Sequence, residues 1–373
     1  MQLTKLGALV IAALLLAAPL PARAAALWFG GEDTSMTAVG TDGTETNGYN
    51  TTFSRIALQA QNSTTVADPP ANRWVSPSFT AQSSLWFHAV FFATTITTTS
   101  GEQAVILRSP DGVGRVYLRQ TGTSGVLKLS IANAARIFTD LVTLSAYSTA
   151  TLTTLDMQVP YTCNAGDVTN IYYNAVLAGT YTGSLCTDSA VSLNAVEVAS
   201  TNNTGNLGSC IIGNTASCWS QLLIANQDTR SMVVDTIILQ GAGATQAWTP
   251  NTLANVNKAT ISDSTFVSTV SAAQISEWTA PTAAPLGTWG VISKSIEARV
   301  LASTTGPQNA EFMEHVSGTD YVVCSGNPAS LTNAFVNYRC QENVSPATST
   351  TWGIGEIFNT GGNQNSFGVQ SLT

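Results

Sequence analysis

The segment TNIYYNAVLAGTYTG, residues 169–183, has the pattern of two short strands that meet at Asn174. β-Branched and aromatic residues are enriched in strands, and Asn is a favoured turn residue because its short polar side chain tolerates a positive φ angle. The segment therefore predicts an antiparallel hairpin.

Similar segments recur along the chain, separated by Gly, Asn, Asp and Ser. Apart from the N-terminal segment, no long stretch keeps a convincing helical period. Many strands joined by tight polar turns predict an all-β fold built as an antiparallel sandwich. The other strand-like segments are 84–96, 102–109, 114–120, 125–132, 153–162 and 232–239.

After Leu239 the chain becomes polar and rich in Gly and Asn, in GAGATQAWTPNTLANVNKA, and the strand pattern then resumes. Polar segments of this kind are typical of domain boundaries. We therefore expect a first sandwich over residues 25–249, a linker over 250–262 and a smaller β-sandwich over 263–373.

Residues 1–24 have the organisation of a secretory signal peptide. Lys5 precedes an apolar run, and Ala22-Arg23-Ala24 matches the small-x-small cleavage pattern. The apolar run is shorter than the roughly 20 residues that span a bilayer. We expect cleavage, a secreted mature chain and no further membrane segment.

The six cysteines fit export, because disulfides form in oxidising compartments. The alternative, a zinc site, needs Cys-x-x-Cys spacing or nearby histidines, and the chain has neither that spacing nor more than two histidines. Proximity in sequence predicts three disulfides, namely Cys163–Cys186, Cys210–Cys218 and Cys324–Cys340.

Charge argues against a nucleic-acid partner. The formal net charge is −8, and the 14 Lys and Arg residues form no basic cluster. Binding to phosphates needs concentrated positive charge.

The sequence offers no catalytic constellation, so we predict a protein that is not an enzyme and assign no catalytic residues. A glycosidase needs two carboxylates across a cleft, and neighbours such as Glu32 and Asp33 point to opposite sides of a strand or lie in a turn. His88, within LWFHAVFF, is interpreted as a packed strand residue, and His315 as a residue on the surface or at a strand edge.

Eight tryptophans offer a second class of site, because sugars stack on exposed aromatic rings. Trp28, Trp86 and Trp219 lie in apolar strand contexts and are expected in the core. The ligand-binding candidates are those near loop-like sequence, although core packing is the competing interpretation for each of them. These candidates are Trp74, Trp278 and Trp289.

Several segments resemble phage and prophage tail-associated or minor virion structural proteins with concanavalin A-like (laminin-G-like) β-sandwich domains. The first two are LWFGGEDTSMTAVG at 27–40, with Glu32 and Asp33, and the hairpin at 169–183. The others are the segment 219–248, with Asp228, Arg230 and Trp248, and the segment 343–369, with Trp352. In the hairpin, Ala175 stands in the place of a glycine, which leaves the turn type open.

The resemblance implies a concanavalin A-like jelly roll followed by a smaller sandwich. It places Asp228 and Arg230 in the loop between the last two strands of the first domain, as an ion-paired or backbone-capping corner, with Trp248 at the exit. The implied function is a non-enzymatic virion structural or adhesion protein, on a phage tail or capsid surface, whose partners are other virion proteins or host glycans.

Two alternatives stay open, because the signal and the paired cysteines are unusual for those virion proteins. One is a secreted bacterial carbohydrate-binding module, and the other is a divergent glycoside hydrolase or lyase. No cofactor is expected. Calcium stays open, because such sandwiches often bind it although no oxygen cage is recognisable here. A homo-oligomer also stays open.

Overall fold

A computed structural model of the chain provides the structure. The signal prediction for residues 1–24 lies outside the described residues. Those described are 26–30, 36–39, 49–50, 55–56, 58–60, 73–93, 103–123, 125–148, 151–199, 217–234, 237, 239–250, 252–255, 264, 266–282, 291–302, 306–324, 329–358 and 365–372.

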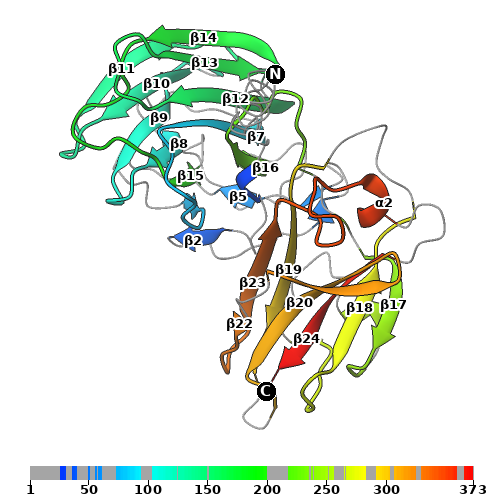
Figure 1. Cartoon of the computed structure of the whole chain (residues 1–373). Helices are drawn as coiled ribbons and strands as arrows, with labels where there is room; N and C mark the ends of the chain where they lie inside the picture. The colour runs from blue at the N-terminus through cyan, green and yellow to red at the C-terminus, as the bar shows by residue number, and fades with distance from the viewer. Residues whose placement is uncertain are drawn as a thin grey trace, which may run out of the picture.

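The fold is all-β, as predicted, and begins with two seven-stranded antiparallel sheets (Figure 1). Sheet 1 has the order β1 (Ala26–Gly30), β16 (Ser217–Ala225), β7 (Ser84–Ala93), β12 (Leu152–Pro160), β13 (Val168–Tyr173), β14 (Val176–Thr182), with β5 (Leu58–Ala60) also pairing with β16. Sheet 2 has the order β11 (Phe138–Thr143), β10 (Leu127–Ala132), β9 (Gly114–Gln120), β8 (Gln103–Arg108), β15 (Ala195–Ala199), β6 (Arg73–Val75), β2 (Thr37–Val39). A short ribbon pairs β3 (Tyr49–Asn50) with β4 (Arg55–Ile56).

The core of this first sandwich lies between the two sheets and follows the two-residue period of a strand. On β7, Leu85, Phe87 and Phe91 are at most 2% exposed and belong to the core cluster. Met157 of β12 and Trp219 of β16 join the same cluster. Alternate residues of these strands therefore point to the other side of sheet 1, which we call the outer face.

The hairpin predicted at 169–183 is present as β13 and β14. Asn174 and Ala175 form its two-residue turn, with φ angles of 49° and 63°. Two central residues with positive φ are typical of a type I′ turn, which matches the twist of the flanking strands. Asn174 is further held by β12, since its side-chain oxygen accepts a 2.8 Å hydrogen bond from the Thr154 backbone N–H.

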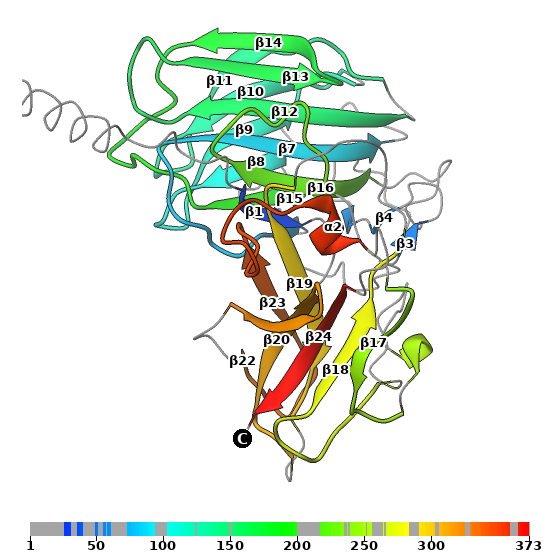
Figure 2. The ribbon, with the colours of Figure 1, turned by 45° about the vertical axis from the view of Figure 1, so that its right-hand side comes forward.

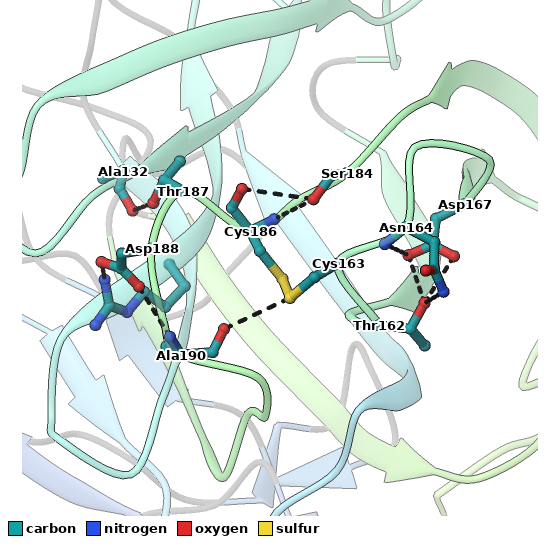
Figure 3. The surroundings of a disulfide bond; sticks show 11 residues. Ala132, Thr162, Cys163, Asn164, Asp167, Ser184, Cys186, Thr187, Asp188 and Ala190 are labelled. Atoms are coloured by element: carbon teal, nitrogen blue, oxygen red, sulfur yellow. Dashed lines mark hydrogen bonds and ion pairs between the residues drawn. A yellow bond between two sulfur atoms is a disulfide. The ribbon is translucent and has the colours of Figure 1, made fainter.

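Two of the three predicted disulfides are present, Cys163–Cys186 and Cys324–Cys340. Figure 3 shows the first, which joins the turn after β12 to the loop after β14. Cys210 lies outside the described residues, so the predicted Cys210–Cys218 bond does too. The two disulfides fit an extracellular protein.

The second sandwich packs a six-stranded sheet against a two-stranded one. The larger sheet orders β17 (Gly241–Gln246), β18 (Ile275–Thr279), β24 (Ser366–Leu372), β20 (Asn309–Val316), β21 (Thr319–Val323), with β22 (Ala329–Ser330) pairing with β20. The smaller sheet pairs β19 (Lys294–Val300) with β23 (Val336–Glu342). The short helices η1 (Leu253–Asn255) and α2 (Ile354–Ile357) lie in its connections.

The second sandwich begins earlier in the chain than the expected linker at 250–262. Strand β17, inside the range assigned to the first domain, pairs with β18. Its sequence GAGATQ has no apolar alternation, so its pairing could not be recognised from sequence. Trp248 consequently lies in the second sandwich, where its indole N–H donates to the Gln274 carbonyl at 3.0 Å, and not at the exit of the first.

The two sandwiches are in direct contact. The Gln341 side-chain amide of β23 donates to the Ala26 carbonyl of β1 at 3.0 Å, and the Arg339 guanidinium lies 4.8 Å from the centre of the Phe29 ring. Figure 2 shows β1 beside the ends of β19 and β23. In the part of the chain that the structure covers, no helix is long and apolar enough to cross a membrane.

Candidate functional site

Two of the tryptophans predicted to bind ligand are buried. Trp74 is 1% exposed in the core of the first sandwich, and Trp278 is 6% exposed on β18 of the second. Both are therefore corrected to packing residues, because the short strands that hold them were hidden in loop-like sequence. Trp289 lies outside the described residues, as do Glu32 and Asp33.

Trp86, expected in the core, lies instead on the outer face of sheet 1 and is only partly buried. Its neighbours Leu85 and Phe87 are the core residues of that stretch of β7. An apolar run such as LWFHAVFF predicts burial for all its members. The two-residue period of a strand places Trp86 on the same side of β7 as His88 and opposite to Leu85 and Phe87. This period was the sequence signal that could have placed Trp86 on the outer face.

A row of polar side chains leads across the outer face to Trp86. Thr180, Asn170, Gln158 and Trp86 occupy successive cross-strand positions on β14, β13, β12 and β7. The Thr180 hydroxyl donates to the Asn170 side-chain oxygen at 2.9 Å, and the Asn170 amide donates to the Gln158 side-chain oxygen at 3.1 Å. We call Thr180, Asn170 and Gln158 the amide row. Its hydrogen bonds hold the three side chains in place.

Trp86, Tyr172 and Arg230 form what we call the aromatic corner. The Trp86 and Tyr172 rings are stacked with centroids 6.2 Å apart and planes 17° from parallel. The Arg230 guanidinium lies 4.5 Å from the Tyr172 centroid and 5.8 Å from the Trp86 centroid. Cation–π contact of this kind orients the guanidinium on the rings.

Asp228 and Arg230 make both contacts that the sequence interpretation named. The Arg230 side-chain Nε donates to the Asp228 carboxylate at 3.0 Å, and the Arg230 backbone N–H donates to the same carboxylate at 3.0 Å. The hydrogen bond from Arg230 holds the pKa of the Asp228 carboxyl below its ordinary value of 3.8. The Asp228 carboxylate thus holds the guanidinium in place together with the two rings.

The loop that carries this pair differs from the expectation. The loop follows β16 of the first sandwich. The next strand, β17, belongs to the second sandwich, so the loop does not join the last two strands of the first sandwich. The segment 232–239 was also expected to form a strand, and none is present among its described residues. Met232 and Val234 pack instead against Leu223 and Ala225.

A buried cluster ties this loop to sheet 1. Asp156 of β12 lies 2.8 Å from Nδ1 of His88 on β7 and accepts a 2.7 Å hydrogen bond from the Thr229 hydroxyl. His88 is 2% exposed, and Asp156 and Thr229 are fully buried, which agrees with the interpretation of His88 as a packed strand residue. We call His88, Asp156 and Thr229 the loop clasp. Because Arg230 follows Thr229 directly, the clasp sets where the guanidinium lies.

Trp352, the last residue named for the resemblance, has structural contacts in the second sandwich. Trp352 is 3% exposed and faces Lys294, whose ammonium nitrogen lies 3.7 Å from the ring centroid. Lys294 is also ion-paired with the buried Glu314. These groups fill the space between the two sheets.

Two groups of side chains have the composition of metal ligands. Cys324, Cys340 and Glu342 form one, but both sulfurs are committed to a disulfide and cannot ligate an ion as thiolates. The other comprises Glu277, His315 and Asp320. His315 was expected on the surface or at a strand edge. Its side chain is partly exposed, at 15%, although β20, which carries it, is an interior strand between β24 and β21.

Comparison with known proteins adds solved structures alone, since no protein-family model and no curated protein matches the chain. The botulinum neurotoxin type G receptor binding domain is 12% identical, with a TM-score of 0.35, over 55% of this chain and 48% of that domain. The carbohydrate binding module CBM66 from Bacillus subtilis is 12% identical, with a TM-score of 0.27, over 41% of this chain and 80% of the module. An endo-β-1,4-glucuronan lyase from Trichoderma reesei is 8% identical, with a TM-score of 0.31, over 54% of this chain and 96% of the lyase.

The prediction that the chain is not an enzyme is contradicted by these comparisons. Polysaccharide lyases recur among the similar structures, with alginate lyases beside the glucuronan lyase. The likeness concerns the β-sandwich fold, which enzymes use as well as binding domains, and it assigns no activity to this chain.

Proposed function

We propose that the outer face of sheet 1 binds a glycan, with the aromatic corner as the stacking surface and the amide row as the hydrogen-bonding surface. The observation that carries the proposal is the continuity of these two surfaces. A sugar ring has apolar C–H faces that pack on aromatic rings and a rim of hydroxyls that bond to amides. Binding sites of this kind combine aromatic walls with a few well-placed polar groups.

The arrangement also favours binding energetically. The amide row lies on three neighbouring strands and its side chains are bonded to each other, so little rotamer freedom remains to be lost on association. Three strand spacings separate β14 from β7, about 14 Å. This length exceeds one monosaccharide, so the expected ligand is an oligosaccharide that runs across the strands from Thr180 to Trp86.

Arg230 favours one kind of oligosaccharide, namely those that carry a carboxylate. Asp228 offsets its charge, but Tyr172 and Trp86 hold the guanidinium plane beside the stacking surface. A guanidinium binds carboxylates in a bidentate geometry that an ammonium cannot match. Saccharides that carry a carboxylate are therefore expected to bind better than their neutral counterparts.

A glycan array followed by calorimetry tests the proposal, with neutral and uronate oligosaccharides as ligands. Trp86→Ala is expected to weaken binding about tenfold, equal to about 1.4 kcal/mol. The matched control is Ile137→Ala, because Ile137 is 65% exposed next to β11 of the other sheet. Absence of binding at millimolar saccharide, or equal affinity of Trp86→Ala and wild type, would refute the proposal.

The same samples distinguish binding from cleavage. Release of shorter or unsaturated products from a bound polysaccharide would show that the protein cleaves it, and an unchanged polysaccharide would show binding alone.

Display on a phage tail or capsid surface is a finer proposal, supported by the sequence resemblance. Mass spectrometry of purified virions tests it, and absence of the chain from virions that are otherwise complete would count against it.

A further inference from the structure

The second sandwich brings together an imidazole and two carboxyl groups from three strands. Glu277 lies on β18, His315 on β20 and Asp320 on β21. One possible ligand atom of each lies within 4.8 Å of the other two. In Figure 1, β18, β24 and β20 run side by side. β21 follows in the sheet order and pairs with β20 on the side away from β24.

Glu277 is built into this position. It is fully buried, and its side chain crosses β24 where Gly368 leaves room, since a Cβ atom at Gly368 would lie 2.7 Å from the Glu277 Cγ. Its Oε2 accepts 3.3 Å hydrogen bonds from the Ser366 hydroxyl and the Thr245 backbone N–H. Its Oε1 has no hydrogen-bond partner among the residues that the structure describes.

The other two groups face Glu277 from the accessible side. Nδ1 of His315 lies 2.5 Å from an oxygen of Asp320, and their side chains are 15% and 38% exposed. Burial, followed by the charge of Asp320, raises the pKa of the Glu277 carboxyl, which His315 partly offsets. Two neighbouring carboxyl groups, one of them buried with an unused oxygen, favour a cation between them.

We propose that Glu277, His315 and Asp320 form a binding site for a divalent transition-metal ion of the zinc class. An imidazole with two carboxylates suits Zn²⁺, Co²⁺ or Ni²⁺, whereas Ca²⁺ takes six to eight oxygen ligands. Metal–ligand distances of about 2.0–2.2 Å in a tetrahedral site place the ligand atoms about 3.3 Å apart. A separation of 4.8 Å therefore closes by about 1.5 Å, and the 2.5 Å contact between His315 Nδ1 and Asp320 opens by about 0.8 Å where that nitrogen is the ligand atom. Both changes are within reach of rotamer adjustment on fixed strands.

Such an ion would link β18, β20 and β21, strands that are not all adjacent in the sheet. Three protein ligands leave a fourth position for water or for a group of a bound molecule. Cysteine and histidine spacing in the sequence does not reveal this site, because its three residues are up to 43 positions apart.

Calorimetry with the full chain after treatment with a chelator tests the site, using Zn²⁺, Co²⁺ and Ca²⁺ as separate probes. One Zn²⁺ per chain is expected, with Co²⁺ binding more weakly and Ca²⁺ not competing. Glu277→Gln and His315→Gln are expected to lower Zn²⁺ affinity at least tenfold and to abolish the rise in melting temperature that Zn²⁺ gives to the wild type.

The matched control is Glu311→Gln, because Glu311 lies on β20 on the same side as His315 but outside the cluster. Asp320→Asn replaces the Glu277 variant if that one fails to fold, since Asp320 is more exposed. Absence of stoichiometric Zn²⁺ binding, or equal affinity of wild type and the cluster variants, overturns the proposal. Preference for Ca²⁺ overturns the assignment to the zinc class.

Discussion

Replacement of Thr229 by valine is the sharpest test of how the candidate site is held together. Valine keeps the shape of threonine and removes the hydroxyl that donates to Asp156 at 2.7 Å. Thr229 and Asp156 are both fully buried, so no water replaces the lost donor. The loop clasp then retains the contact between His88 and Asp156 alone.

The expected cost is the desolvation penalty of a buried acceptor that loses its donor, about 1–3 kcal/mol. Thr229→Ser is the control, because it keeps the hydroxyl and removes one methyl group, which costs about 0.8 kcal/mol. A domain of this size loses roughly 2–4 °C of melting temperature for each kcal/mol. Thr229→Val is therefore expected to melt at least a few degrees lower than wild type, and lower than Thr229→Ser.

Thermal unfolding by circular dichroism measures the stability, and saccharide titration measures the coupling to the site. Because Arg230 follows Thr229, Thr229→Val is also expected to weaken saccharide binding, whereas Thr229→Ser leaves the affinity near that of wild type. If the valine variant melts at or above the temperature of the serine variant, the hydroxyl of Thr229 does not hold the loop to sheet 1.

Three further predictions concern the first sandwich. Ala175→Gly is expected to stabilise the hairpin by up to about 1 kcal/mol in thermal unfolding, because an L-residue at φ 63° costs about 1–2 kcal/mol that glycine avoids, less the larger chain entropy of glycine; a lower melting temperature would contradict this. Replacing Cys163 and Cys186 together by serine removes a bond across a sequence separation of 23, which the chain-entropy expression values at about 3.4 kcal/mol, measurable by denaturant titration against the oxidised wild type. A hydrogen bond from the Ala190 backbone and, after it, the charge of Arg115 hold the pKa of the Asp188 carboxyl below 3.8 in the folded state. The stability that this carboxylate contributes is therefore present above pH 3.8 and is lost as the pH falls through its pKa in the folded protein. Asp188→Asn is therefore expected to lower stability at neutral pH and to remove part of the acid-induced loss, and identical pH profiles for variant and wild type would exclude this role.

Local sequence pattern predicted the features that depend only on residues close together in the chain. The alternation in 169–183 and the turn preference of Asn174 are properties of neighbouring residues, and the hairpin is present. The Cys163–Cys186 and Cys324–Cys340 bonds close short loops, which have a low entropic cost of closure. The ion pair of Asp228 and Arg230 also joins residues only two positions apart.

Local sequence pattern did not predict which aromatic side chains are exposed and which are buried. Trp74 and Trp278 were expected to be accessible and are buried, whereas Trp86 was expected in the core and lies on the outer face of sheet 1. Strand alternation separates two sides of a sheet, but it does not say which side another sheet or loop will cover.

By itself, then, the sequence determined an all-β chain, its predicted strand segments other than 232–239, and two sequence-local disulfides. Only the tertiary structure decided the candidate sites, because cross-strand register joins residues that no spacing rule connects. Asp156 meets His88 and Thr229 across sequence separations of 68 and 73 residues. Glu277, His315 and Asp320 meet only because β24 lies between β18 and β20 in the folded sheet.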